Sequence, residues 1–238
     1  MGTVVSNADA KALSTSIGDF LFKDRNADGI IDDQDMTFLG TALPVFTLGW
    51  NNQITVRNLK FSVFCYAPIG GKVFNFTRRK IDEPSAISGS YNNKSTQVVN
   101  YARWAYADGN PGNLDVWNVY VAEGAHPLQS RIDENNGNYN SRVSDRYVED
   151  GTFLRLKTVS ATWSVPKRVT KKWRLNTLNL TLSVQNVYTL TRYSGYDPEV
   201  GANNGQYSFN GSGMLLYGVD TGRIPSPRTI TFTLDTSF

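Results

Sequence analysis

The chain has 238 residues, of which 40% are hydrophobic and 12% aromatic, with a mean hydropathy of -0.36; these values are typical of a folded chain and exclude a disordered one. Its 24 basic and 21 acidic residues give a net charge of +3, which is too balanced to indicate nucleic acid as a partner. The one basic cluster, at 167–174, is expected to decorate a solvated turn.

No run of the sequence approaches the roughly eighteen consecutive apolar residues that a membrane-spanning helix requires. If the chain meets a membrane, it must therefore do so with strands. The single cysteine, Cys65, excludes an internal disulfide. It lies in an apolar stretch and is predicted to be a small buried or lipid-facing hydrophobe.

Two segments in the first third of the chain alternate apolar and polar residues with a period of two. Over 45–56 the even positions are mostly apolar and the odd positions mostly small or polar, and 59–67 continues the alternation with some aromatic residues on both faces. This pattern predicts two strands with unlike faces. Only Arg57 and Asn58 separate them, which predicts a tight hairpin.

Three further strands are predicted later in the chain, at 152–165, 177–188 and 228–238. In the first of these, apolar residues change from even to odd positions around Lys157 and Thr158, which predicts a bulge there. Each predicted strand is roughly ten residues long, the length that a tilted strand needs to cross a bilayer.

The connections separate two all-β folds that share this strand pattern, a transmembrane β-barrel and a large soluble β-sandwich. In antiparallel order, the turns at 57–58 and 166–176 fall on the side where the last strand ends. The long connections, 68–151 and 189–227, fall on the opposite side with the segment before Val45. Short turns on one rim and long loops on the other are typical of outer-membrane barrels.

Oxygen-bearing side chains recur at alternate positions over 24–35. They match positions 1, 3, 5, 9 and 12 of a calcium loop, with Gly29 at position 6 and the Ile30 carbonyl at position 7. Alternate side chains converge in such a loop because the backbone wraps around the ion. The alternative is an Asp, Asn and Gly turn before a strand. The predicted side-chain ligands are Asp24, Asn26, Asp28, Asp32 and Asp35; an Asp at position 12 departs from the EF-hand Glu and is similar to dockerin-type loops.

The 68–151 connection is rich in Asn, Tyr and Gly, and it carries four aromatic residues of interest: Trp104, Tyr106, Trp117 and Tyr120. Aromatic faces stack on sugar rings, and Asn or Asp side chains bond hydroxyl groups, so these residues are candidates for glycan contact. The alternatives are packing within the loop and contact with a partner protein.

The sequence carries little that indicates catalysis. The only histidine, His126, lies before Pro127 without a Cys/His cluster, an HExxH motif or a Gly-x-Ser-x-Gly elbow. The carboxylate neighbours at 82–83 and 133–134 would serve a glycosidase only if they faced each other across a cleft, and nothing in their spacing indicates that. We predict that the chain is not an enzyme.

Five ordered blocks of sequence resemble the C-terminal region of the SusC/RagA family of TonB-linked outer-membrane transporters of Bacteroidetes. The blocks are residues 18–32 with 39–40 and 44; 147–157; 185–190; 193–200; and 218–220 with 225, 227–229 and the final Phe238. An amphipathic last strand that ends in an aromatic residue is also similar to the family's habit. The blocks run from residue 18 to the last residue, so the resemblance covers most of the chain.

This resemblance implies the C-terminal strands of a 22-stranded barrel whose lumen is closed by a plug domain. Such proteins lie in the cell outer membrane, in contact with its lipid. They import oligosaccharides, or in some members peptides, with energy relayed by TonB, and a SusD-like surface lipoprotein caps them. Residues 1–238 would supply strands and extracellular loops, with the calcium loop on the outer side. The plug, the N-terminal strands and the TonB-contacting segment would lie outside the chain.

Residues 1–10 lack the basic and apolar regions of a secretory signal peptide, so the sequence is expected to be a fragment of a longer protein. Two other classes stay open on the residues alone. A secreted calcium-dependent carbohydrate-binding or adhesive β-sandwich would be a soluble monomer, whereas a barrel fragment would need detergent. A glycoside hydrolase domain would show turnover and a cleft with two carboxylates.

Overall fold

The computed structural model describes residues 20–82, 96, 103–115, 117–123, 142–199, 201–202, 216–222 and 224–238. The chain divides into two compact units. We call the one made of Gly40–Phe74 and Glu149–Phe238 the sheet unit, and the one made of Met1–Leu39 and Asn75–Val148 the loop unit.

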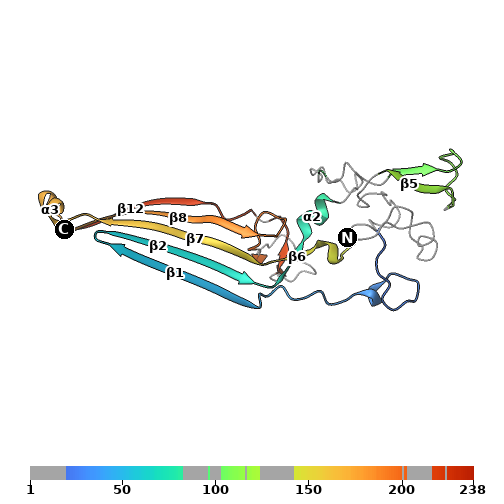
Figure 1. Ribbon diagram of the computed structural model, residues 1–238, viewed down its shortest axis with the longest axis horizontal. Coiled ribbons are helices and arrows are strands. Elements are labelled where there is room, and N and C mark those ends of the chain that lie inside the picture. The colour runs from blue at the N-terminus through green and yellow to red at the C-terminus, as the bar shows by residue number, and fades with distance from the viewer. Residues whose placement is uncertain are drawn as a thin grey trace, which may run out of the picture. The chain divides into compact units, whose positions relative to one another are not determined.

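The sheet unit is built on a five-stranded antiparallel sheet in the order β1-β2-β7-β8-β12, whose strands lie side by side (Figure 1). These strands are β1 (Phe46–Val56), β2 (Leu59–Ile69), β7 (Phe153–Ser164), β8 (Thr177–Thr191) and β12 (Thr229–Ser237). All five predicted strands are therefore confirmed, and β2 and β8 continue past their predicted ends. The predicted all-β class is also confirmed, since strands dominate the described residues and the helices are short.

The tight hairpin between β1 and β2 is confirmed by its register. Val56 lies opposite Leu59, so only Arg57 and Asn58 form the turn. Arg57 has a φ of 53°, and two-residue hairpin turns need such a positive φ to match the twist of their strands. The Ser164 N–H donates to the Asn58 carbonyl oxygen at 2.8 Å and so joins this turn to the end of β7.

The predicted bulge in β7 is also confirmed. The register of β7 with β8 shifts between Leu156 and Thr158, which leaves Lys157 without a direct partner in the ladder. On β8 the residue facing this irregularity, Asn186, has a φ of 53°. The shift explains the change of apolar phase in the sequence, because it returns the apolar residues of β7 to one face of the sheet.

The two faces of the sheet differ in polarity. We call one the apolar face. It carries large side chains from every strand, each 42–69% exposed: Phe46, Leu48, Trp50, Ile54, Val56, Leu59, Phe61, Leu154, Trp163, Leu182, Tyr188, Leu190, Ile230, Phe232 and Leu234. On the opposite, polar face, hydroxyl groups meet across strands; Thr162 and Thr181, for example, are 2.9 Å apart. Within the described residues no second sheet covers the apolar face, as a β-sandwich would require.

The two ends of the sheet differ in their connections. At the end that we call the short-turn end lie the β1–β2 turn and the β7–β8 connection, which holds α3 (Lys167–Thr170) and η6 (Lys171–Trp173). The Asn176 N–H donates to the Ser237 carbonyl oxygen at 2.7 Å, so β12 ends here too. Figure 1 shows α3 and the C-terminus at this same end. The predicted arrangement of short turns is therefore observed.

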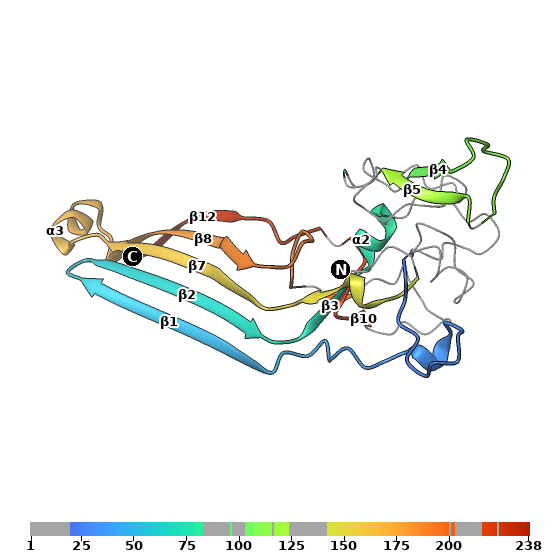
Figure 2. The same ribbon diagram turned by 45° about the vertical axis from the view of Figure 1, so that its right-hand side comes forward.

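At the opposite end, the sheet unit adds a three-stranded sheet in the order β11-β3-β6, with β3 (Lys72–Asn75), β6 (Val148–Asp150) and β11 (Val219–Asp220). A short pair, β9 (Gly201–Ala202) and β10 (Leu216–Tyr217), accompanies it; β3 and β10 are seen in Figure 2. Val73 and Tyr193 form a small buried core. Gly218 has a φ of 79°, and a Cβ there would lie 2.3 Å from the Ala42 Cβ, so glycine is required for this close approach.

The loop unit is made of short elements. They are η1 (Asp33–Asp35), α2 (Phe76–Ile81), η5 (Asp145–Tyr147) and a hairpin of β4 (Arg103–Tyr106) with β5 (Val119–Glu123), which Figure 2 shows. The Asn75 side chain caps α2 by accepting the Arg78 N–H at 2.8 Å. The Arg146 guanidinium lies 4.5 Å from the centre of the Phe20 ring, and both Phe20 and Tyr147 are buried. Among the described residues, no helix has the length and apolarity to cross a membrane.

Candidate functional sites

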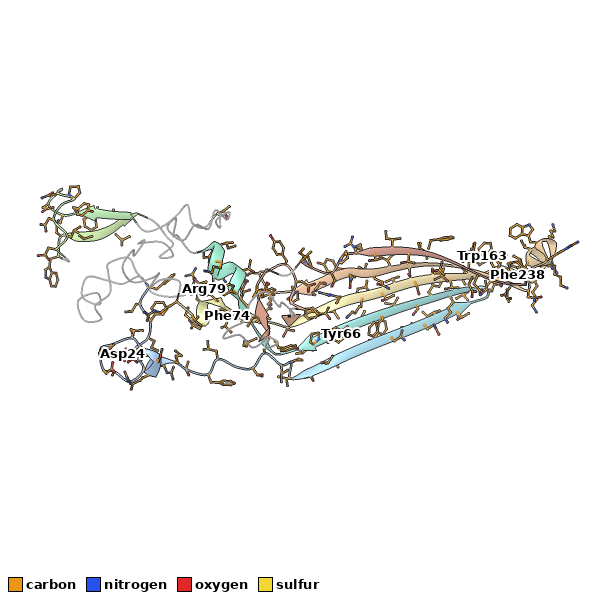
Figure 3. All side chains as sticks on the ribbon, turned by 180° about the vertical axis from the view of Figure 1, so that it is seen from behind. Asp24, Tyr66, Phe74, Arg79, Trp163 and Phe238 are labelled. Carbon is orange, nitrogen blue, oxygen red and sulfur yellow. The ribbon has the colours of Figure 1, made fainter. Side chains whose placement is uncertain are left out.

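The segment 24–35 of the loop unit forms a closed loop, and the Asp24 carboxylate lies at its start (Figure 3). One oxygen of this carboxylate accepts the Ala27 N–H at 2.6 Å and the other accepts the Gly29 N–H at 2.8 Å. Ala27 and Gly29 have φ values of 61° and 81°, which turn the backbone back toward Asp24. The glycine at position 6 thus supplies the sharp turn that the sequence predicted.

The next side chains repeat one local pattern. Asn26 accepts the Asp28 N–H at 3.2 Å, and Asp28 accepts the Ile30 N–H at 2.8 Å. Asp32 accepts the Gln34 N–H at 2.8 Å in the same way. Each side chain bonds the amide two residues on, which is the Asx turn that short Asp and Asn side chains favour. The pattern fixes the alternate positions of the loop without any contact from outside it.

Asp35 closes the loop. Its carboxylate accepts the Arg25 N–H at 2.6 Å and the Asp32 N–H at 2.9 Å. These backbone bonds, that of Arg25 first, lower the pKa of Asp35 below its usual value because they favour the charged form. Position 12 is therefore ionised and tied to position 2 across the loop.

The loop is also held from within its own unit. A guanidinium nitrogen of Arg142 donates to the Ile31 carbonyl oxygen at 3.4 Å, and the Arg142 guanidinium lies 5.3 Å from the centre of the Phe22 ring. In the described part of the chain, no three His, Cys, Asp or Glu side chains converge closely enough to hold a metal ion in this conformation. Calcium binding by this loop stays a prediction.

The four aromatic candidates do not form one platform. Tyr106 lies opposite Val119, whereas Tyr120 lies opposite Ala105, so the two tyrosines are on opposite faces of the β4–β5 hairpin. Trp104 belongs to β4. Trp117, in the connection between the strands, is 63% exposed and Tyr120 is 47% exposed. Trp117 and Tyr120 are therefore exposed to a ligand, whereas Tyr106 is half-buried.

A hydrogen-bonded turn that the sequence analysis did not single out positions Trp117. The Asp108 carboxylate accepts the Asn110 N–H and the Asn113 side-chain amide, each at 2.8 Å. These two bonds, in that order, lower the pKa of Asp108. The Asp115 side chain in turn accepts the Trp117 N–H at 3.0 Å. The signal was the repeated Asp, Asn and Gly spacing of 108–115, which resembles that of 24–35.

The polar face of the sheet unit carries a buried charge cluster that sequence reasoning missed. Arg155 of β7 is 2% exposed. Its guanidinium pairs with Asp197 and with Glu199, each at an N–O distance of 2.5 Å, and its Nε donates to the Thr189 hydroxyl at 2.9 Å. Because each of its nitrogens has a partner, the cation is satisfied out of water. The blocks 147–157, 185–190 and 193–200 contain these residues, but their sequence spacing gave no sign of the pairing.

The bulged Lys157 joins the same cluster. Its ammonium lies 3.3 Å from a Glu199 carboxylate oxygen and 4.9 Å from the centre of the Tyr66 ring. Lys157 lies two residues after Arg155 along β7, so strand alternation places both side chains on the polar face. A cavity of about 710 Å³ opens here, and its lining includes Tyr66, Phe153, Lys157, Gln185 and Glu199.

The segment after β8 is tied to the sheet unit at a second point. The Tyr193 hydroxyl donates to an Asp220 carboxylate oxygen, and burial followed by this bond raises the pKa of Tyr193 well above its usual range. The Ser194 N–H and hydroxyl both donate to Glu149, at 2.8 and 2.7 Å. The block 193–199 is therefore a fixed strap on the sheet unit.

Of the residues considered for catalysis, the structure describes only Asp82. His126, Glu83 and the pair at 133–134 lie outside the described residues. Asp82 is 3% exposed and lies 3.5 Å from the Arg78 guanidinium and 3.6 Å from that of Arg146. Its role is to join α2 to η5 within the loop unit.

The sequence matches no protein-family model. It is similar to TonB-dependent receptors P3, P26 and P39 of Formosa agariphila, with 30%, 28% and 26% identity over 221, 222 and 223 residues. Each match covers 93% of this chain but only 19–20% of the relative. The chain thus spans about a fifth of the length of these curated relatives.

Solved structures with a similar fold include the RagAB peptide transporter, with a TM-score of 0.53 and 17% identity over 83% of this chain and 17% of that chain. The RagAB peptide importer in its closed-closed state gives a TM-score of 0.61 and 18% identity over 89% of this chain and 20% of that chain.

In its long antiparallel strands and in its sequence, the chain is similar to a segment of the TonB-dependent receptors. The predicted resemblance to a segment of a SusC/RagA-type TonB-linked transporter is confirmed. The relatives are receptors and transporters, so the prediction that the chain is not an enzyme is confirmed as well.

Proposed function

We propose that this chain forms part of the wall of a TonB-dependent β-barrel in the outer membrane of a Bacteroidetes bacterium. The observation that carries the proposal is the apolar face, which leaves side chains such as Trp50, Leu182 and Phe232 about half exposed or more. Burying such a face in lipid removes apolar surface from water at a gain of roughly 25 cal/mol per Å². The polar face then lines the lumen.

The sheet edges support a larger barrel. In the described part of the chain, β1 pairs only with β2, and β12 pairs only with β8. An open edge in lipid leaves backbone groups without hydrogen bonds, so further strands of the same receptor must continue the sheet on both sides. We infer that the remaining strands complete a 22-stranded barrel, and that a plug domain and a TonB-contacting segment lie in the part of the receptor outside this chain.

The proposed activity of the whole receptor is TonB-dependent import of oligosaccharides or peptides, together with a SusD-like surface lipoprotein. The exposed Trp117 and Tyr120 favour sugars, because flat aromatic faces can stack on sugar rings. Trp104 and Tyr106 stay candidates for substrate contact, with Tyr106 on the opposite face of the hairpin from Tyr120. The similarity to a peptide transporter keeps peptides as the other candidate substrate class.

We also propose that the 24–35 loop binds a structural calcium ion through Asp24, Asn26, Asp28, Asp32 and Asp35, with the Ile30 carbonyl. Asx turns hold the side chains of Asn26, Asp28 and Asp32 against the backbone of this loop. A carboxylate oxygen that accepts one N–H keeps a further lone pair for a cation. Calcium would stiffen the loop, and it has no catalytic part.

The transport proposal is tested with the full-length receptor in its own bacterium. Uptake of labelled oligosaccharides and of labelled peptides is measured in the parent strain, in a strain without the receptor and in one without TonB. We expect uptake of one substrate class to fall to background in both deletion strains. Uptake of both classes at parental rates in the strain without the receptor would overturn the proposal.

A further inference from the structure

The β7–β8 connection concentrates positive charge at the short-turn end. Residues 166–176 contain five basic side chains and no acidic one. All five are exposed: Lys167, Arg168, Lys171, Lys172 and Arg174. Every ion pair found among the described residues involves other side chains. Five mutually repelling charges are thus held together without an ion-pair partner among the described residues.

The connection is folded rather than extended, which keeps these charges together. Thr170, at the end of α3, is 1% exposed, and its hydroxyl lies 3.4 Å from the Lys167 carbonyl oxygen. The Leu175 N–H donates to the Thr170 carbonyl oxygen at 3.1 Å, and Arg174 has a φ of 56°, which ends η6. The backbone therefore presents the cations from one compact turn.

Apolar side chains accompany the cations. Val169 and Trp173, four residues apart, are 39% and 62% exposed. At the same end of the sheet lie Trp163 of β7 and the final Phe238, which Figure 3 labels and which are 43% and 88% exposed. Tryptophan and basic residues at the border of an apolar band are typical of a membrane–water interface.

A hollow of about 260 Å³ lies between the two short turns. Its lining includes Asn58, Lys167, Asn176 and Asn179. Amide and ammonium groups of this lining are hydrogen-bond donors, and Val165, Pro166 and Leu178 add apolar surface, so the hollow offers both kinds of contact.

We propose that the connection with α3 and η6 binds the headgroups of anionic phospholipids at the short-turn rim. A free phosphate would pair with the basic side chains but would leave Trp173 and Val169 in water. A lipid pairs with the basic side chains through its headgroup and covers the two apolar side chains with its acyl chains. The proposal rests on the proposed function, because the apolar face must lie in a membrane for this rim to meet headgroups.

The test uses the full-length receptor, purified in uncharged detergent and placed in vesicles of phosphatidylcholine with or without phosphatidylglycerol. Lipid affinity is measured by native mass spectrometry. Trp173 quenching by brominated lipid, taken as the difference from W173F, gives a second readout. The variant K167Q/R168Q/K171Q/K172Q removes four charges, and K167R/K171R/K172R preserves them. We expect the wild type and the Arg variant to prefer phosphatidylglycerol, and the Gln variant to bind it at least about tenfold more weakly.

Each outcome separates the two proposals. Insertion into vesicles with equal affinity of the wild type for both lipids would overturn the lipid inference alone. Equal phosphatidylglycerol affinity of the Gln variant and the wild type would do the same. Displacement of phosphatidylglycerol by inorganic phosphate at millimolar concentration would assign the site to free phosphate and overturn it too. A receptor that enters neither vesicle would overturn the proposed function.

Discussion

The guanidinium of Arg155 pairs with the carboxylate of Asp197 at a distance of 2.5 Å, although the two residues are 42 positions apart. Both are largely buried, at 2% and 8% exposure. The pair ties the connection that follows β8 to the polar face of β7, next to the bulge at Lys157. A strap held in this way keeps one side of the 710 Å³ cavity in place.

Removing the cation should destabilise this strap. We expect R155A to cost about 3 kcal/mol of unfolding free energy, because Asp197 would keep a buried charge without its partner. The measurement is the urea midpoint of the full-length receptor, followed by the mobility change of the folded barrel on gels. R168A removes an exposed arginine that has no ion pair among the described residues, and it should change the unfolding free energy by less than about 0.5 kcal/mol. Equal midpoints for R155A and R168A would contradict the prediction.

The sheet face should decide how an inserted arginine is tolerated. Leu182 lies on the apolar face near the middle of β8, and Ser183 lies on the polar face beside it. An arginine that faces lipid near the bilayer midplane costs about 2–4 kcal/mol. We therefore expect L182R to lower the amount of folded receptor in outer-membrane fractions several-fold, with S183R close to wild type. If S183R lowered the amount of folded receptor more than L182R did, the proposal that the apolar face meets lipid would be contradicted.

Calcium binding can be tested with a control inside the same loop. Asp24 and Asp28 occupy ligand positions, whereas Asp33 lies at position 10 and accepts none of the loop's N–H bonds described above. Calorimetry of the full-length receptor should give one calcium site in the wild type and in D33N. It should give none in D24N/D28N. If the wild type released or absorbed no heat at millimolar calcium, the calcium proposal would be wrong.

Substrate contact by Trp117 can be distinguished from a general effect of losing an exposed tryptophan. Trp117 and Trp173 are equally exposed, at 63% and 62%, but lie in the β4–β5 and the β7–β8 connections respectively. If Trp117 stacks on substrate, W117A should weaken oligosaccharide binding by the full-length receptor about two- to tenfold, in keeping with about 0.5–1.5 kcal/mol for an aromatic contact. W173A should leave that affinity unchanged. Titration calorimetry in detergent measures both, and identical losses would contradict a contact specific to Trp117.

The five long strands could be predicted because each has one apolar and one polar face, so apolar and polar residues alternate clearly along its sequence. The same alternation located the bulge at Lys157, since an extra residue must shift the apolar phase. Arg155, Asp197 and Glu199 could not be grouped in advance. Their meeting depends on how the segment after β8 folds back, and no local pattern records that.

The aromatic candidates show a different limit. Tyr106 and Tyr120 were grouped because both lie in one aromatic-rich connection, yet the register of their hairpin puts them on opposite faces. A change of one residue in register reverses the face, and nothing in the local sequence fixed that register. The Asx turns of 24–35 were better anticipated, because each involves residues only two positions apart.

Lipid contact along β12 tests the central claim most directly. In a C65S background of the full-length receptor, spin labels are placed one at a time by I230C, T231C, F232C and T233C. Collision with oxygen, which concentrates in lipid, is compared with collision with a water-soluble nickel complex. We predict high oxygen access at 230 and 232 and low access at 231 and 233. Equal access at all four positions, or the reverse alternation, would contradict a barrel wall whose apolar face meets the membrane.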